Sequence, residues 1–294
     1  GGDSTVRLRM GVGPGRAELD ARQRGELLQA DAQVSGVELA SFANAYLGRL
    51  SGTLSLRGQG QRLDGTLDAA IDGGRDRDAA PSEALSAKVR AVLSDTRVRI
   101  DASATNPQGL AAKLELDVPA EATAAPFRVA LVRNQPVDGV FDAEGELRPL
   151  WDLFAGGART LTGRGAVHAR LAGTLNSLRP TGEATLDDGR FQDGGTGFDV
   201  RNLTVQASFD RNAVDVRRFS GEDGHGGQAR GSGEVSLAPG GMSTFNAELD
   251  GFRLIDNELA RASASGEVTI TRDAEGKAKL TGSLMVDRAD ITAN

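Results

Sequence analysis

The chain has 294 residues, of which 39% are hydrophobic and only 4% aromatic, so it can bury apolar surface but has few large side chains to fill a compact core. Its net charge of −7, with acidic and basic residues interspersed, argues against binding to nucleic acid or to anionic lipid headgroups. It has no cysteine, which excludes disulfides, thiol catalysis and thiolate metal sites. Its 39 glycines suit many turns between short strands and favour an extended β architecture.

The first part of the chain is predicted to be strands and turns with one helix. Apolar residues alternate with polar ones from Ala17 to Ala21 and from Leu28 to Val34, which predicts a hairpin that turns at residues 23–25. Residues 39–50 instead place apolar side chains at a 3.6-residue period, which predicts a helix that contains Tyr46. Residues 81–95 fit one helical face or a strand, and their alternation, continued through residues 98–104, favours a hairpin.

The remainder continues as strands around residues 110–118, 127–131 and 137–147 and then to residue 291, with a second short helix near Trp151. Pro119 to Pro126 reads as a Pro/Ala linker. We expect one elongated β segment over residues 1–294, with a possible hinge at 119–126 between residues 1–118 and 127–294. Alternation that already runs at Val6 and still runs at residue 291 predicts that this sequence is a segment of a longer protein.

A helix–strand–turn–strand unit at residues 150–191 recurs elsewhere in the chain. Residues 39–71 repeat its helix, its glycine and its strands, and a third copy occupies residues 266–291. Residues 182–191 and 282–291 align with their apolar positions and an aspartate, Asp187 or Asp287, in register. Repetition of this kind indicates a chain built by stacking one supersecondary unit.

Each predicted strand has one apolar and one polar face, so the sheet must hide one side. About twenty strands at ~4.8 Å per step would give a body of roughly 95 Å, and twisted sheets of that size curl or fold over. The apolar side chains then either close on each other as an ordinary sandwich core or line an open trough. Periodicity alone leaves both arrangements possible.

The segments WDLFAGGARTLTGRGAVHARLAGTLNSLRPTGEATLDDGRFQDGGTGFDVRNLTVQASFD (151–210) and RASASGEVTITRDAEGKAKLTGSLMVDRADI (261–291) resemble the TamB family and the wider AsmA-like group. The similarity is strongest from Gly139 to Ile291 and rests on the style of the repeats. It implies an all-β fold, a sheet folded over like a taco shell around an apolar trough, with one or two short helices. It further implies a periplasmic protein anchored to the inner membrane in its full-length form.

The function that the resemblance implies is conduction of phospholipids between the inner and outer membranes, support of outer-membrane protein assembly, or both. The expected partners are phospholipid acyl chains and a TamA-like outer-membrane barrel, which docks through parts of the protein outside this sequence. Moving two acyl tails unaided across water costs on the order of 20 kcal/mol, and an apolar trough removes most of that barrier. The hypothetical lining consists of Leu54, Leu56, Leu67, Ile71, Val98, Ile100, Leu114, Leu116, Val129, Leu131, Leu171, Leu186, Val205, Leu237, Leu249, Val268, Ile270, Leu284 and Val286.

Other functions remain as alternatives. A structural, adhesin-like β-solenoid would have a closed core, and a chaperone-type scaffold would pair barrel strands at its sheet edge by β-augmentation. A carbohydrate-active β-helix enzyme needs Asp, Arg or His gathered on one face, and the scattered charges do not provide this. We therefore expect no enzyme activity, no cofactor and no metal.

Few polar residues stand out as candidate sites. His168 is predicted on the polar face of a strand and His225 in a loop, and a metal or general-base role for either would need converging partners. The acidic pairs at residues 187–188 and 222–223 lack calcium-loop spacing and read as solvated turn residues. Trp151 and Tyr46, the sole Trp and Tyr, are predicted to pack helices over the sheet ends or, as an alternative, to gate the trough.

Overall fold

The computed structural model describes residues 3–42, 45–77, 79, 81–94, 96–154, 159–238 and 240–291. In this part of the chain, 18 strands belong to one large antiparallel sheet, and helical structure is confined to α1 (Arg148–Phe154) and two 3-10 turns (Leu39–Ser41 and Pro81–Glu83). The all-β prediction is therefore confirmed, and of the two predicted helices only the one near Trp151 is observed among the described residues. Folding of the sheet over a trough stays a prediction.

The chain divides into two compact units, which are described separately. Unit 1 comprises Gly1–Asp142 and Arg170–Leu178, and unit 2 comprises Ala143–Ala169 and Arg179–Asn294. The predicted hinge at residues 119–126 lies within unit 1 and stays a prediction. Strands β10 (Asp138–Glu146), β11 (Arg159–Thr174) and β12 (Ser177–Asp193) contribute residues to both units.

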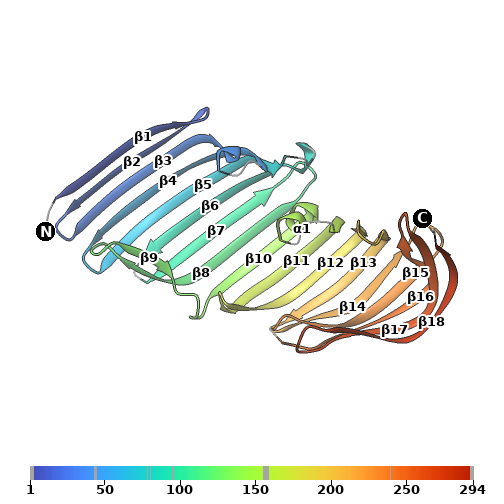
Figure 1. Cartoon of the computed structure of the whole chain (residues 1–294). Coiled ribbons are helices and arrows are strands. Elements are labelled where there is room, and N and C mark those ends of the chain that lie inside the picture. The colour runs from blue at the N-terminus through green and yellow to red at the C-terminus, as the bar shows by residue number, and fades with distance from the viewer. Residues whose placement is uncertain are drawn as a thin grey trace. The chain divides into compact units, whose positions relative to one another are not determined.

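In unit 1 each strand from β1 to β8 pairs antiparallel with the next, so the strands lie side by side in chain order (Figure 1). The last of them, β8, pairs with β9 and also with β10. The strands are β1 (Ser4–Val12), β2 (Gly15–Arg24), β3 (Leu27–Glu38), β4 (Tyr46–Gln59), β5 (Arg62–Asp76), β6 (Leu85–Ser94), β7 (Arg97–Thr105), β8 (Ala111–Thr123) and β9 (Arg128–Leu131).

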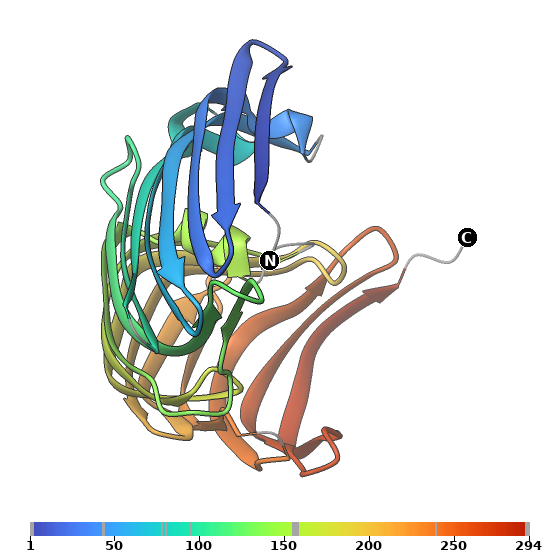
Figure 2. The same cartoon turned by 90° about the vertical axis from the view of Figure 1, so that its left-hand side faces the viewer.

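Unit 2 continues the same up-and-down order from β12 to β18. Its strands bend along their length (Figure 2). They are β13 (Phe198–Asp210), β14 (Ala213–Glu222), β15 (Gln228–Ser236), β16 (Ser243–Asp256), β17 (Ala260–Arg272) and β18 (Ala278–Ile291).

Two local predictions can be decided directly. The hairpin expected at residues 85–104 is confirmed as β6 and β7. The helix expected at residues 39–50 is wrong: only Leu39–Ser41 form a 3-10 turn, and β4 begins at Tyr46. The bulge between Leu47 and Arg49 shifts the strand alternation by one residue, which makes the apolar spacing resemble a helical period.

The linker expected at residues 119–126 is also wrong over most of its length, because β8 continues to Thr123. Ala120, Ala122 and Ala124 are buried in alternation. Alanine carries too little apolar surface to make this alternation visible in the sequence. Pro119 lies within β8, opposite Arg97 in the register with β7.

β-bulges interrupt the ladders of both units. Register shifts follow Val34 and Ile71 in unit 1 and Leu186 and Leu249 in unit 2. Asp187 and Asp188, expected at a turn, lie at such a bulge inside β12. A bulge bends its strand and increases the local twist, so these positions contribute to the curvature of each unit.

Candidate functional site

One face of unit 1 is apolar across all strands from β1 to β8. Residues directly opposite each other in an antiparallel pair share a face, so the registers define rows that cross the strands. A central row consists of Leu8, Leu19, Ala32, Leu54, Leu67, Ala91, Ile100 and Leu116. The rows on either side consist of Val6, Ala21, Ala30, Leu56, Gly65, Leu93, Val98 and Val118, and of Met10, Ala17, Val34, Gly52, Ala69, Val89, Ala102 and Leu114.

This apolar face is not covered by a second layer at its centre. Leu67 lies on β5, near the middle of the central row, and is 37% exposed. Leu8 lies on β1 at the end of the same row and is 46% exposed. The chain as a whole exposes 17674 Å², against about 12,000 Å² for a compact monomer of 30.6 kDa.

The segment that follows Val118 covers one end of this face. Ala120, Ala122 and Ala124 pack against the buried side chains of Leu63 and Leu93. The amide of Ala124 donates a hydrogen bond to the carbonyl oxygen of Gly60, in the turn between β4 and β5, at 2.9 Å. The segment of residues 120–124 therefore covers this end of the apolar face, and the centre of the face stays uncovered.

The corresponding face of unit 2 is partly filled by its own side chains. Leu186, Leu249 and Phe252 belong to one buried cluster, in which Leu186 is 5% exposed and Phe252 is fully buried. On β17 and β18 the face opens again, since Ile270 and Val286 are 40% and 64% exposed. Unit 2 thus combines a packed core with an exposed apolar border.

Aromatic rings close one end of the unit 2 face. Trp151 of α1 meets Phe191 edge-on at 6.1 Å between ring centroids, and Phe191 meets Phe198 at 6.3 Å. Phe198 in turn lies 5.6 Å from Phe252. The indole Nε1 of Trp151 donates a hydrogen bond to the carbonyl oxygen of Arg159 at 3.1 Å, which fixes α1 at the start of β11. These contacts favour a packing role over a gating role for Trp151. Tyr46 lies in strand β4 and not in a helix, so the prediction that it packs a helix over the sheet is wrong.

The registers place the predicted lining residues as follows. Those of β4, β5, β7 and β8 all share the apolar face of unit 1, and most of those of β12 to β18 share the apolar face of unit 2. Val129 and Leu131 lie on β9 and are exposed, Leu171 is half-buried on β11, and Leu237 lies just beyond the end of β15. The role of these residues in holding lipid stays a prediction.

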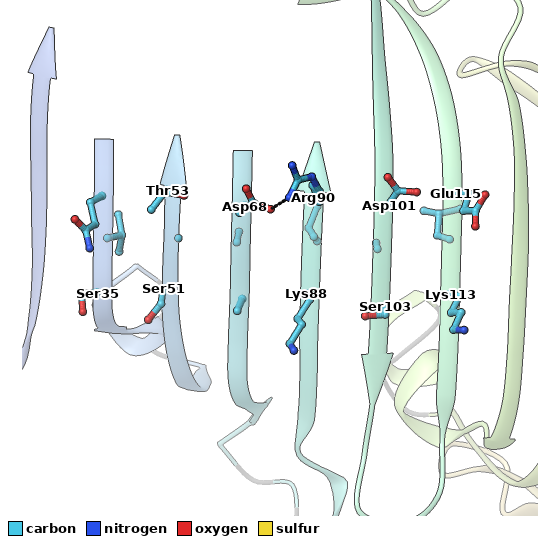
Figure 3. Close-up of a pocket in the computed structure, with 18 residues that line it drawn as sticks. Ser35, Ser51, Thr53, Asp68, Lys88, Arg90, Asp101, Ser103, Lys113 and Glu115 are labelled. Carbon is cyan, nitrogen blue, oxygen red and sulfur yellow. Dashed lines mark hydrogen bonds and ion pairs between the residues drawn. The ribbon is translucent and has the colours of Figure 1, made fainter. Parts of the chain in front are cut away.

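The opposite face of unit 1 carries a furrow of about 660 Å³ that crosses β3 to β8 (Figure 3). Two rows of polar side chains form its walls, and the backbone between them forms its floor. One wall consists of Gln33, Thr53, Asp68, Arg90, Asp101 and Glu115. The other consists of Ser35, Ser51, Ala70, Lys88, Ser103 and Lys113. Sequence reasoning missed this furrow, because its residues are single polar positions on six different strands.

A buried carboxylate organises the loop between β14 and β15. Asp223 is 4% exposed, and its Oδ1 accepts hydrogen bonds from the amides of His225 at 2.7 Å and Gly227 at 2.9 Å. Its Oδ2 accepts one from the amide of Arg253 on β16 at 2.8 Å. Burial raises the pKa of Asp223, and these three hydrogen bonds outweigh burial, so that its pKa lies below the ordinary value. The expectation of a solvated turn acid is wrong for Asp223.

Charge networks surround this loop. Asp199 pairs with Arg190 at 2.7 Å and with Arg201 at 2.9 Å, and the hydrogen bond from Arg190 lowers its pKa most. Asp256 pairs with Arg253 at 2.8 Å, and that hydrogen bond lowers its pKa most. Both carboxylates line a cavity of about 180 Å³ whose acids are all paired or hydrogen-bonded.

The two histidines lie on different elements of the fold. His168 is exposed on β11, and Nε2 of His225 lies 3.7 Å from a carboxylate oxygen of Asp256. Within the described ranges, no group of three or more His, Cys, Asp or Glu side chains is placed to hold a metal ion. Among the same residues, no helix is both long and apolar enough to cross a membrane.

Comparison with known proteins bears on the C-terminal part of the chain. No curated protein and no solved structure matches the chain significantly. Residues 217–294, which run from within β14 to the end of the chain, match the family model described as the TamB C-terminal domain. This C-terminal part of the chain is therefore similar to the TamB C-terminal domain.

Proposed function

We propose that the chain is a periplasmic segment of a TamB-like protein, anchored to the inner membrane in its full-length form, whose apolar face carries phospholipid acyl chains between the inner and outer membranes. The protein acts without catalysis: it binds lipid tails and needs no cofactor. The match of residues 217–294 to the TamB C-terminal domain supports this proposal. The observation that carries it is the uncovered apolar face of unit 1, with Leu67 exposed at its centre.

The energetics of the face fit a transient lipid carrier. Each methylene that leaves water for an apolar surface gains ~0.8 kcal/mol. Leu54, Leu67 and Ile100 offer a continuous apolar surface across strands, so a tail can shift from one strand to the next without re-entering water. The polar headgroup remains in solvent, which needs no charged site on this face.

Site-specific photocrosslinking tests the proposal. A photoreactive residue at Leu67 faces the apolar side, and one at the neighbouring Asp68 faces the polar side of the same strand. In cells or with phospholipid vesicles, we expect lipid to be captured from position 67 and not from 68. Equal capture from both positions, or from neither, would contradict lipid conduction along this face.

Support of outer-membrane protein assembly is a second candidate. Strand β18 lies at the outer edge of unit 2 (Figure 2) and pairs with β17 along Ala278–Ile291. It contains no proline, and its apolar Leu280 and Val286 are exposed, so an unfolded barrel strand can add to it by β-augmentation. A photoreactive residue at Met285 that captures barrel precursors, while position 67 captures no lipid, would favour this role over conduction.

A further inference from the structure

We propose that the furrow on the polar face of unit 1 binds a linear acidic oligosaccharide. The furrow lies on the face opposite the apolar rows, so this inference is independent of lipid conduction. It crosses β3 to β8, five strand steps of ~4.8 Å, or about 24 Å in length. That length and the volume of about 660 Å³ suit an extended chain of several sugar rings.

The charge on the walls identifies the anionic part of the ligand. Lys88 on β6 and Lys113 on β8 flank Ser103 on β7 in one row (Figure 3). Neither lysine forms an ion pair or a side-chain hydrogen bond in the described part of the chain. The backbone positions of the two lysines are separated by two strand steps, about 10 Å, and the side chains present spaced positive charges to carboxylates that recur along a ligand.

The other wall points to a ligand rich in hydroxyl groups. Asp101 and Glu115 lie directly opposite each other, a like-charge pair that disfavours the sheet. Elsewhere on this face opposite charges are paired, as for Arg90 with Asp68 at 3.3 Å and Arg57 with Asp31 at 2.8 Å. Neither Asp101 nor Glu115 has an ion-pair partner among the described residues, so both can accept hydrogen bonds from sugar hydroxyls.

Two other classes of linear polymer fit the furrow less well. A peptide that lies across the strands would find few partners for its main chain, because the ladders already use the backbone groups of the sheet. A nucleic acid binds single strands by stacking its bases on aromatic rings, and no aromatic ring lines the furrow. An oligosaccharide carries its polar groups around its rings and matches the mixed walls of carboxylate, ammonium and hydroxyl groups.

Isothermal titration of the whole chain with hexagalacturonate tests the proposal. We expect measurable binding that weakens with the shorter digalacturonate and with added salt. Replacement of both furrow lysines (Lys88→Gln with Lys113→Gln) is expected to weaken binding about tenfold or more, because each loses a charged contact. The matched control replaces the only other lysines of the chain, Lys277→Gln with Lys279→Gln, and is expected to leave binding within about twofold.

Each alternative has its own outcome. An absence of hexagalacturonate binding, or an equal loss in the two double variants, would overturn the site. Equal affinity for polyglutamate of the same length would overturn the assignment to a saccharide. Circular dichroism of the exposed-lysine variants verifies that they are folded. None of these results depends on whether a phospholipid is captured at Leu67.

Discussion

Gly163 and Gly189 approach each other so closely that a Cβ atom on Gly163 would lie 2.6 Å from the Cα atom of Gly189. In unit 1, a Cβ atom on Gly48 would lie 2.8 Å from the Cα atom of Gly74. Both pairs have the same separation in sequence, and in both the first glycine has a positive φ, +133° and +128°. The internal repeat is thus a structural one, in which a glycine pair lets neighbouring strands approach at a bulge.

Replacement of Gly163 by alanine is therefore expected to destabilise unit 2. The new methyl group would meet backbone atoms that cannot move aside, and the positive φ strains any residue with a Cβ, so we expect a loss of roughly 1–3 kcal/mol. Gly11→Ala serves as the control, because nothing lies within 4 Å of its Cβ position and its φ is not positive. Urea unfolding of both variants measures the difference, and equal midpoints would contradict the clash.

Asp223 is expected to stabilise the native state at neutral pH. Asp223→Asn places an amide donor against the amide of Arg253, Gly227 or His225, so we expect a loss of about 1–3 kcal/mol at pH 7. The folded-state pKa lies below the ordinary 3.8 of the unfolded chain, so this contribution is fully present above 3.8 and is lost as the pH falls through the folded pKa.

Denaturant unfolding of Asp223→Asn and wild type at pH 7 and below pH 4 measures this effect. The difference in unfolding free energy is expected to shrink at the lower pH. Asp187→Asn is the control, because Asp187 is exposed and its side chain makes no hydrogen bond in the described part of the chain. A difference that stays constant with pH would assign the loss to packing instead of charge.

Two leucines on the same face of β5 separate stability from lipid binding. Leu63 is 1% exposed in the cluster that closes the end of the face, and Leu67 is exposed at its centre. We expect Leu63→Ala to cost about 2–5 kcal/mol in unfolding free energy, and Leu67→Ala to cost much less. If lipid lies on this face, Leu67→Asp reduces the phospholipid retained after gentle purification, as measured by mass spectrometry, while the fold is kept.

The contact between Trp151 and Phe191 is expected to couple α1 to β12. A double-mutant cycle with Trp151→Ala and Phe191→Ala measures this coupling, and edge-to-face ring pairs give about 0.5–1.5 kcal/mol. Trp151 is the only tryptophan, so its variants are followed by circular dichroism instead of fluorescence. Additive effects of the two substitutions would show that α1 does not depend on Phe191.

Much of the fold could be predicted from the sequence, because strand alternation is a local signal. The alternation predicts that Leu54, Leu67 and Ile100 share a face. The registers confirm this, because Leu54 lies directly opposite Leu67, and Ala91 of β6 lies between Leu67 and Ile100 in the same row. The signal failed where a bulge changes the period, as at Leu47, and where alanine marks the buried positions, as at Ala122. In both cases the strand is recognised only from its pairing with another strand, which a local sequence pattern does not show.

The candidate sites were less predictable, for a related reason. Asp223 in the sequence resembles any turn acid, and only the approach of Arg253 from another strand makes it a buried acceptor. The furrow depends on Lys88 and Lys113, which are 25 positions apart and meet only through β7. Periodicity reveals which face a residue occupies, but it does not reveal which residues of distant strands become neighbours.

The strict two-sidedness of the strands has a consequence for how such a protein changes length in evolution. Loss or gain of a single residue within a strand would turn every later side chain of that strand to the wrong side. Loss or gain of a whole hairpin would leave both surfaces continuous and alter only the distance that they span. Relatives of such a protein are therefore expected to differ in length by whole hairpins. The distance that the sheet spans can then change in evolution without a change in the chemistry of its two faces.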